Sequence, residues 1–319
     1  MDSDTYILVG RRDGGANLIN LRSGNIELID FRFNLANTFN SFATIGESVY
    51  IFASYFHQNS FFRVSMRTKV IDFNGEFNNG VIGGHCISVC YDGLDHVYLI
   101  GGRKGSDKQH LNRIDRFNCR TNTFEKYFYQ QQQQQQQTTS TSSISNKNTS
   151  SLLSSNSSYF IISVYLNGLI YSVLANEKSI LIFNTLDRSI YKYQSDQLFD
   201  KTISACTDIN NNNINKTNNN SNSDNIYLHS NDGRFIRFNV NSKVITKLNP
   251  IIEQRVDDFL SMVFHNVSEH ENNIYLLGGT QYKYHRYSVE NNHSQSLPLF
   301  NNLNTNNNNN DCGASIISF

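Results

Sequence analysis

One tyrosine recurs along the 319-residue chain, each time inside a short apolar run, and this repetition restricts the fold more than any other feature. The six copies are Tyr6, Tyr50, Tyr98, Tyr171, Tyr227 and Tyr275. They are 44, 48, 73, 56 and 48 residues apart, and the two longest intervals contain a glutamine-rich and an asparagine-rich tract. Without the tracts the period is about 50 residues, which indicates a repeat architecture whose units bury their apolar faces against one another.

A second pattern, found independently, lies 11–19 residues after each tyrosine. An apolar residue followed by Asn or Ser is paired with a second apolar residue seven positions later, and a small polar residue stands between them. The pairs are Ile19 and Ile26, Val64 and Ile71, Phe117 and Phe124, Phe183 and Ile190, Phe238 and Ile245, and, as the one departure, Tyr287 and Ser294. The small polar residues are Ser23, Thr68, Thr121, Asp187, Ser242 and Asn291. Such side chains bond to nearby backbone groups in tight turns, so the pattern predicts one β-hairpin of fixed length in every unit.

A further β-type run precedes the tyrosine run in five of the six units, which gives each of these five units four strands, A to D in chain order. The first unit lacks strand A, and the chain ends with one extra run of this kind at 314–319. A ring of such units leaves unpaired strand edges unless it closes. We therefore predict that 314–319 pairs with residues 5–9.

The segment 95–127 combines these features: an apolar run ends in Gly101-Gly102, and Phe117 and Phe124 occupy the hairpin positions. It resembles the kelch repeat, with Phe124 where that motif usually has Trp. Residues 272–289 resemble it as well. The resemblance implies an all-β, six-bladed kelch-type β-propeller closed by its C-terminal strand. We expect the whole chain, 1–319, to form one domain. Its expected blades are 1–31 plus 312–319, 41–75, 85–128, 159–194, 202–248 and 259–300.

Three low-complexity tracts interrupt the pattern: a Gln/Ser/Thr-rich tract at 130–158 and Asn-rich tracts at 210–224 and 301–310. They contain too little apolar surface to offset the entropy of ordering, so we expect disordered loop insertions. The first and third lie in D–A connections. The second lies in an A–B connection, which is expected on the opposite rim.

The composition excludes several classes of protein. The 27 basic and 27 acidic residues balance, which argues against nucleic-acid binding and polybasic membrane binding. No apolar stretch reaches the roughly 18 residues of a transmembrane helix, and the N-terminal residues lack the pattern of a signal peptide. Five cysteines without an export signal indicate reduced thiols. A soluble cytoplasmic protein is expected.

Few patterns typical of catalytic or metal sites occur. Cys86 and Cys90, with His85 beside them, lie on one predicted inner strand, where a four-residue spacing separates the thiols by more than about 10 Å. No Cys-x-x-Cys, His-Glu-x-x-His or Gly-x-Ser-x-Gly motif is present. We therefore expect buried structural thiols, and we assign no catalytic, cofactor-binding or metal-binding residue.

An enzymatic alternative follows from the resemblance. Kelch-like propellers include copper radical oxidases similar to galactose oxidase, which use Tyr, His and a Tyr–Cys crosslink, and the chain contains 17 Tyr, 9 His and 5 Cys. This alternative is a carbohydrate-active or redox enzyme with its site at the central channel. The six tyrosines share one repeat position, however, which favours packing between blades. The preferred function is a non-enzymatic scaffold or adaptor that binds a protein or peptide.

In kelch adaptors the B–C and D–A connections share the rim that commonly binds the partner. Arg and Tyr, which are enriched at interface hot spots, occur in the irregular B–C loops of this chain. The candidate partner-binding residues are Arg11, Arg12, Tyr55, His57, Arg103, Lys104, His110, Tyr282 and Lys283. The cations favour a partner with acidic or phosphorylated groups. Glu253, Asp257 and Asp258, in a D–A connection on the same rim, weaken that preference.

Overall fold

The computed structural model describes most of the chain outside the three low-complexity tracts. The described residues are 4–12, 14–30, 33–36, 38–105, 109–129, 161–174, 177–208, 224–252, 255, 260–268, 270–278, 284–297 and 311–318. The predicted insertions 130–158 and 301–310 lie outside them, as does 210–224 except for Asp224. The expected disorder of the tracts therefore stays a prediction.

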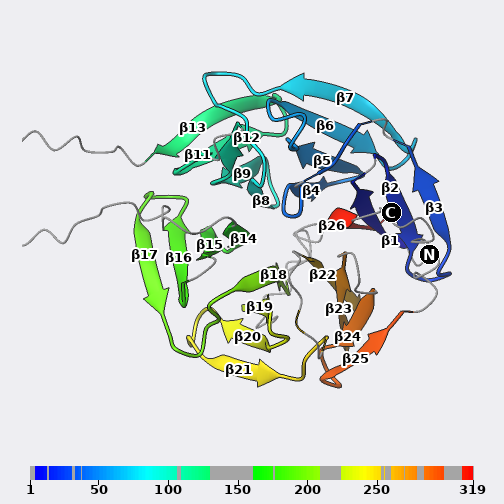
Figure 1. Cartoon of the computed structure of the whole chain (residues 1–319), viewed down its shortest axis with the longest axis vertical. Coiled ribbons are helices and arrows are strands. Elements are labelled where there is room, and N and C mark those ends of the chain that lie inside the picture. Colours follow the sequence, from blue (N-terminus) through cyan, green and yellow to red (C-terminus); the bar gives the residue numbers. More distant parts are fainter. Residues whose placement is uncertain are drawn as a thin grey trace, which may run out of the picture.

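Six four-stranded sheets follow one another around a ring, as Figure 1 shows, and the described residues form strands without any helix. Blade 1 contains β26 (Asp311–Ser318), β1 (Thr5–Arg11), β2 (Ala16–Asn20) and β3 (Ile26–Ile29). Blade 2 contains β4 (Phe42–Ile45), β5 (Ser48–Phe52), β6 (Ser60–Ser65) and β7 (Val70–Glu76). Blade 3 contains β8 (Ser88–Tyr91), β9 (His96–Ile100), β12 (Arg113–Asn118) and β13 (Thr123–Tyr129).

The remaining three sheets repeat this order from the inner strand to the outer one. Blade 4 contains β14 (Ile161–Leu166), β15 (Leu169–Leu174), β16 (Ser179–Asn184) and β17 (Ile190–Gln194). Blade 5 contains β18 (Thr202–Thr207), β19 (Asn225–Ser230), β20 (Phe235–Asn239) and β21 (Ile245–Leu248). Blade 6 contains β22 (Ser261–Ser268), β23 (Glu271–Leu277), β24 (His285–Ser288) and β25 (His293–Ser296). A short extra hairpin, β10 (Arg103–Lys104) and β11 (Gln109–His110), lies in the B–C connection of blade 3.

The C-terminal strand closes the ring, which confirms the predicted closure. Strand β26 runs antiparallel to β1, with Thr5 opposite Ser318 and Val9 opposite Ala314. Ile317 is fully buried in a cluster shared by blades 1 and 2. The last strand of the chain therefore supplies strand A of the first blade, and neither β1 nor β26 lacks a partner.

The predicted hairpin is present in all six blades with the predicted register. Each C-strand apolar residue lies opposite the residue seven positions later on strand D. In blade 3, for example, Phe117 pairs with Phe124. The Asn or Ser that follows the C-strand residue accepts hydrogen bonds from the turn: Asn118 Oδ1 accepts the backbone N–H groups of Arg120 at 2.9 Å and Thr121 at 3.0 Å.

The residue after each predicted small polar residue adopts a left-handed backbone. These residues are Gly24, Lys69, Asn122, Arg188, Lys243 and Asn292, with φ between 48° and 72°. Five of the six are not glycine, so the turn imposes this conformation on residues that rarely adopt it. The repeated hydrogen bonds from the Asn or Ser side chain compensate for that strain, which explains why this pair of positions repeats.

The apolar surface is buried between neighbouring blades. Between blades 2 and 3, Phe52 and Phe61 of blade 2 pack against Phe117 and Phe124 of blade 3, with ring centroids 4.9–6.4 Å apart. Five of the six repeated tyrosines are buried, and Tyr6 is partly buried. Their aromatic rings therefore belong to the packing between blades, as their shared repeat position predicts.

The inner strands surround a central cavity of about 200 Å³. Its lining mixes apolar side chains with hydroxyls, including Thr44, Ser163, Thr207 and Ser315. Thr44 and Ser315 hydrogen-bond to each other, so blade 2 and the closing strand are linked across the cavity wall. None of the described segments forms a helix that could span a bilayer.

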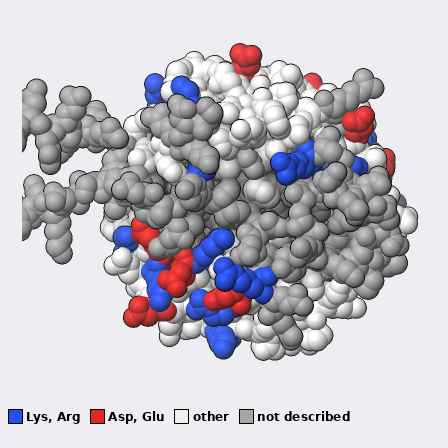
Figure 2. Space-filling view, in the orientation of Figure 1, with Lys and Arg blue, Asp and Glu red and all other residues white. Residues whose placement is uncertain are grey.

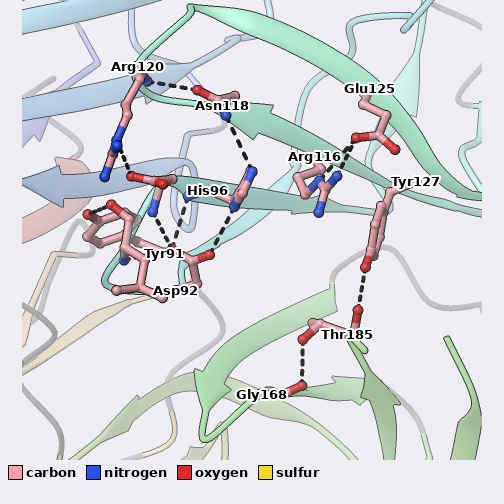
Figure 3. A network of polar contacts seen from close by, with 12 residues as sticks. Tyr91, Asp92, His96, Arg116, Asn118, Arg120, Glu125, Tyr127, Gly168 and Thr185 are labelled. Carbon is pink, nitrogen blue, oxygen red and sulfur yellow. Dashed lines mark hydrogen bonds and ion pairs between the residues drawn. The ribbon is translucent and has the colours of Figure 1, made fainter. Parts of the chain in front are cut away.

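The A–B turn of blade 3 is held by one carboxylate (Figure 3). Asp92 Oδ1 accepts the backbone N–H groups of Leu94, Asp95 and His96 at 2.8–3.0 Å. On the same side of the blade, Arg120 pairs with Asp95 at 2.5 Å. These polar groups satisfy one another within two turns, so we assign this network a structural role.

One predicted strand begins later than expected. The inner strand of blade 3 starts at Ser88, so Cys86 lies before it in a turn with φ of 54°. The bridge between His85 and Arg103 holds this segment against the B–C loop and separates it from the strand. Burial raises the pKa of the Cys86 thiol to about 12, and it also raises the pKa of Cys90, which lies on β8. Both thiols are therefore protonated at neutral pH.

Candidate partner-binding rim

The B–C loops and D–A connections meet on one rim. The N–H of Tyr55, in the B–C loop of blade 2, donates to Ala36 O in the preceding D–A connection at 2.9 Å. In the same way, the N–H of Asn231 in blade 5 donates to Lys201 O at 3.1 Å. These hydrogen bonds hold the B–C loops of blades 2 and 5 against the preceding D–A connections, so the rim has a defined shape at these two places.

Three loops converge where blades 2 and 3 meet. They are the B–C loop of blade 2, the B–C loop of blade 3 and the D–A connection between the blades. The N–H of Gly105 donates to Gln58 Oε1 at 2.9 Å, which joins the two B–C loops. The N–H of Gly83 donates to Asn59 Oδ1 at 3.3 Å, which joins the D–A connection to blade 2.

The close packing of these loops requires glycine in the D–A connection. A Cβ atom on Gly83 would lie 1.8 Å from the carbonyl oxygen of Gln58. A Cβ atom on Gly84 would lie 2.6 Å from the carbonyl oxygen of Arg103. Any larger residue at these two positions would push the D–A connection away from the B–C loops, so the glycine pair determines the shape of the rim here.

Large apolar side chains are exposed at this junction. Tyr55 is 42% exposed, Phe56 is 62% exposed and Ile82 is 44% exposed. Tyr55 and Phe56 are adjacent in the chain with ring centroids 5.1 Å apart, and the Tyr55 ring contacts His85 edge-on at 5.2 Å. We call Tyr55, Phe56, Ile82 and the exposed Lys104 the blade 2–3 surface.

A buried ion pair supports the segment that carries Ile82. Arg113 Nε lies 2.7 Å from Asp115 Oδ2, and both side chains are buried. Arg113 Nη2 donates to Ile82 O, and the Tyr129 hydroxyl donates to Asp115 Oδ1 at 2.5 Å. Burial raises the pKa of the Asp115 carboxyl and the positive charge of Arg113 opposes that rise. Loss of either partner would leave an uncompensated buried charge beneath the rim.

The predicted cations occupy different environments. Lys104 and Arg12 are exposed, whereas Arg103 is only 7% exposed and its backbone pairs with both His85 and His110. Arg103 therefore lies beneath the surface and positions the loop. Arg11 is partly buried at the end of β1, opposite Asp311, so Arg11 and Arg12 lie one blade away from the blade 2–3 surface.

The predicted histidines also help to shape the rim. His57 contacts Phe33 and Phe62 edge-on, at 6.0 Å and 5.9 Å between ring centroids. Burial, and then the charge of Arg103, lower the pKa of both His85 and His110. Both imidazoles are therefore neutral at neutral pH, and exposed Lys104 provides positive charge at this surface.

Two predicted residues, Tyr282 and Lys283, lie outside the described residues, as do the acidic Glu253, Asp257 and Asp258. Phe56 and Ile82 were not among the predicted site residues. A partial signal for Ile82 exists in the sequence, because two apolar residues, Val81 and Ile82, stand between the turn-forming Asn78-Asn79-Gly80 and Gly83-Gly84, although Val81 is buried. An apolar residue in such a segment lies on a loop, where it is exposed more readily than on a strand.

The charges on the face shown in Figure 2 are mixed. Lys and Arg side chains alternate with Asp and Glu over β17 to β21. Ion pairs in these two blades include Lys192 with Glu177 at 2.7 Å and Arg234 with Asp232 at 2.8 Å. Within the described part of the chain, no group of three or more His, Cys, Asp or Glu side chains is arranged to hold a metal ion.

The chain is similar to known proteins in one sequence motif and in its structure. Residues 94–127 match the family model of the kelch motif. A chain in the crystal structure of a nidogen/laminin complex has a TM-score of 0.58 and 9% identity, over 98% of this chain and 98% of that chain. The computationally designed Ika8 protein has a TM-score of 0.45 and 8% identity, over 93% of this chain and 74% of the designed one. No curated protein sequence matches.

The chain is thus a six-bladed β-propeller that carries a kelch motif in its third blade. Kelch propellers commonly serve as scaffolds for protein interactions, and they are typically non-enzymatic.

Proposed function

We propose that this protein is a non-enzymatic scaffold that binds a protein or peptide through the blade 2–3 surface of its B–C/D–A rim. The observation that supports this most is the exposure of Tyr55, Phe56 and Ile82 on two of the three loops that hydrogen bonds hold together. Exposed aromatic side chains on a rigid base provide large contact area at little cost in conformational entropy, as at interface hot spots.

The charge at this surface indicates the kind of partner. Lys104 is exposed on the B–C loop of blade 3, which is joined to the loop that carries the aromatic side chains, and Arg12 is exposed on blade 1. Arg and Lys form charge-assisted hydrogen bonds with carboxylates and phosphates. The expected partner therefore combines apolar side chains with acidic or phosphorylated groups. We also propose a cytoplasmic location.

Affinity purification with two matched variants tests this proposal. The rim variant is Y55S/F56S/I82S. The control variant, L94S/L186S/V244S, replaces three exposed apolar side chains in A–B and C–D turns. We expect the rim variant to lose the recovered partner and the control variant to retain it. Equal recovery by both folded variants would exclude the blade 2–3 surface, and stoichiometric copper in the purified protein would favour the enzymatic alternative.

A further inference from the structure

A second surface feature lies between blades 4 and 5, away from the blade 2–3 surface. It is a hollow of about 280 Å³ between the connection that follows β17 and the outer strands β20 and β21. The lining residues are Gln197, Phe199, Arg234, Ile236, Ile245 and Lys247. Phe199 and Ile236 belong to the core between these blades, so the hollow opens directly onto that core.

The geometry of the sheet explains the mixed character of the lining. Ile236 on β20 pairs with Lys247 on β21, and Ile245 is two positions before Lys247, so these side chains share one face of the sheet. That face is turned toward blade 4, where Phe199 covers part of it. The inner part of the hollow is therefore apolar, and its cationic residues are exposed.

The cations differ in how they are held. The Arg234 guanidinium lies 4.9 Å from the centre of the Phe199 ring and pairs with Asp232 at 2.8 Å, so its position is fixed. The Lys247 side chain is exposed and has no hydrogen bond or ion pair with any residue that the structure describes. Two cations line the hollow; the Asp232 carboxylate neutralises Arg234, so Lys247 is the cation that is available to a ligand.

The size of the hollow restricts the occupant. Sites for small organic ligands usually exceed about 300 Å³ and enclose most of the ligand. At about 280 Å³ this hollow is at the lower end of that range, and it lies at the surface beside the B–C loop of blade 5, which suits one bulky apolar side chain of a longer chain. A carboxylate next to that side chain in the sequence would reach Lys247.

The geometry points to a docking site for an acidic peptide segment, in which one Phe or Leu side chain enters the hollow and a flanking Glu or Asp contacts Lys247. Charge complementarity selects the acidic flank, and the apolar lining selects the inserted side chain. The inference is independent of the blade 2–3 surface.

Fluorescein-labelled ten-residue peptides test the site on the full chain by anisotropy. The probe peptide contains Glu-Phe-Glu between Gly and Ser residues, and the two control peptides contain Gln-Phe-Gln and Glu-Ala-Glu. We expect the probe to bind at least about ten-fold more tightly than either control peptide. No binding of the probe, or equal binding of all three peptides, would overturn the proposal.

Two charge-reversal variants localise the binding. Lys247→Glu should weaken binding of the probe by about ten-fold, because it replaces an attraction with a repulsion of similar size. Lys126→Glu, at an exposed cation on the outer strand of blade 3, makes the same change in net charge and should leave the dissociation constant within about two-fold. If both variants weakened binding of the probe equally, the effect would be explained by net charge alone, which would contradict the proposed site.

Two further measurements distinguish this hollow from the blade 2–3 surface, and a peptide ligand from a small carboxylic acid. The Y55S/F56S/I82S variant should bind the probe as tightly as wild type does. The proposal for this hollow can therefore be refuted without refuting the proposal for the blade 2–3 surface, and the reverse is also true. The small acid 4-phenylbutyrate should compete only at much higher concentration than the unlabelled probe. Binding of 4-phenylbutyrate that is tighter than binding of the peptide would assign the hollow to a small carboxylic acid and refute the peptide proposal.

Discussion

His229 should make the propeller sensitive to acid, and its replacement by Leu should remove that sensitivity. The residue lies two positions after the repeated tyrosine of blade 5, where the other blades have Leu8, Phe52, Ile100, Val173 and Leu277. All of these side chains are buried, and His229 is 0% exposed. Neither of its ring nitrogens has a hydrogen-bond partner among the described residues. An imidazole therefore occupies a core position of the repeat.

The size of the stability loss at low pH follows from the pKa of His229. Burial lowers the pKa of His229 from 6.5 to about 4, against the opposing charge of Asp232. Between these two values the unfolded chain binds a proton that the folded chain does not, so the free energy of unfolding falls as the pH falls. The loss from this residue is about 2 kcal/mol at pH 5, and it approaches about 3 kcal/mol below pH 4.

Urea unfolding of wild type and His229→Leu at pH 7.5 and pH 5 measures this effect. At pH 7.5 the variant should be more stable by about 1–2 kcal/mol, because an unpaired buried polar group is removed. At pH 5 the difference should grow by about 2 kcal/mol. The comparison is necessary because burial raises the pKa of Asp208 to about 6, and that group stabilises the folded state as the pH falls. A difference that does not change between the two pH values would refute the assigned burial of a neutral His229.

Three further predictions concern the architecture. Ile317→Ala should lower the free energy of unfolding, measured in urea, by about 2–4 kcal/mol, because Ile317 is fully buried at the closure of the ring. As a control, Leu186→Ala, at a turn residue that is 92% exposed, should change it by less than about 0.5 kcal/mol. Asn118→Ala should cost about 1 kcal/mol by loss of the turn acceptor, and Asn118→Ser should cost less because Ser65 accepts a similar bond in blade 2; equal costs would contradict this role. Short Gly/Ser linkers in place of 130–158, 210–223 and 301–310 should leave the melting temperature nearly unchanged, and a large decrease would show that the tracts contribute to the fold.

The sequence predicted the fold well because its signals are local. Each hairpin depends on residues within about ten positions of one another, such as Phe117, Asn118 and Phe124, and the same arrangement occurs six times. The closure followed from the same repeat, because the first unit lacks strand A and the C-terminal run is an extra strand of that kind. Position along the chain was therefore sufficient to predict which strands pair.

The rim could not be predicted to the same degree. Whether Arg103 is exposed depends on the D–A connection that carries His85 and on the loop that carries Gln58, and neither contact is encoded near Arg103 in the sequence. Ile82 and Phe56, which come from two different loops, are both exposed at this junction. The residue types in the B–C loops indicated a binding rim, but the contacts between loops decide which of them reach the surface.

The central claim is that a partner binds at the blade 2–3 surface, and site-specific photo-crosslinking tests it most directly. The photoreactive amino acid p-benzoylphenylalanine is placed at Phe56 in one protein and at Leu186 in another, since both side chains are exposed and Leu186 lies in a C–D turn. Each protein is irradiated with its bound partner, and the crosslinked product is quantified. The account predicts a crosslinked partner from position 56 and none above background from position 186. A product from position 186, with none from position 56, would contradict it.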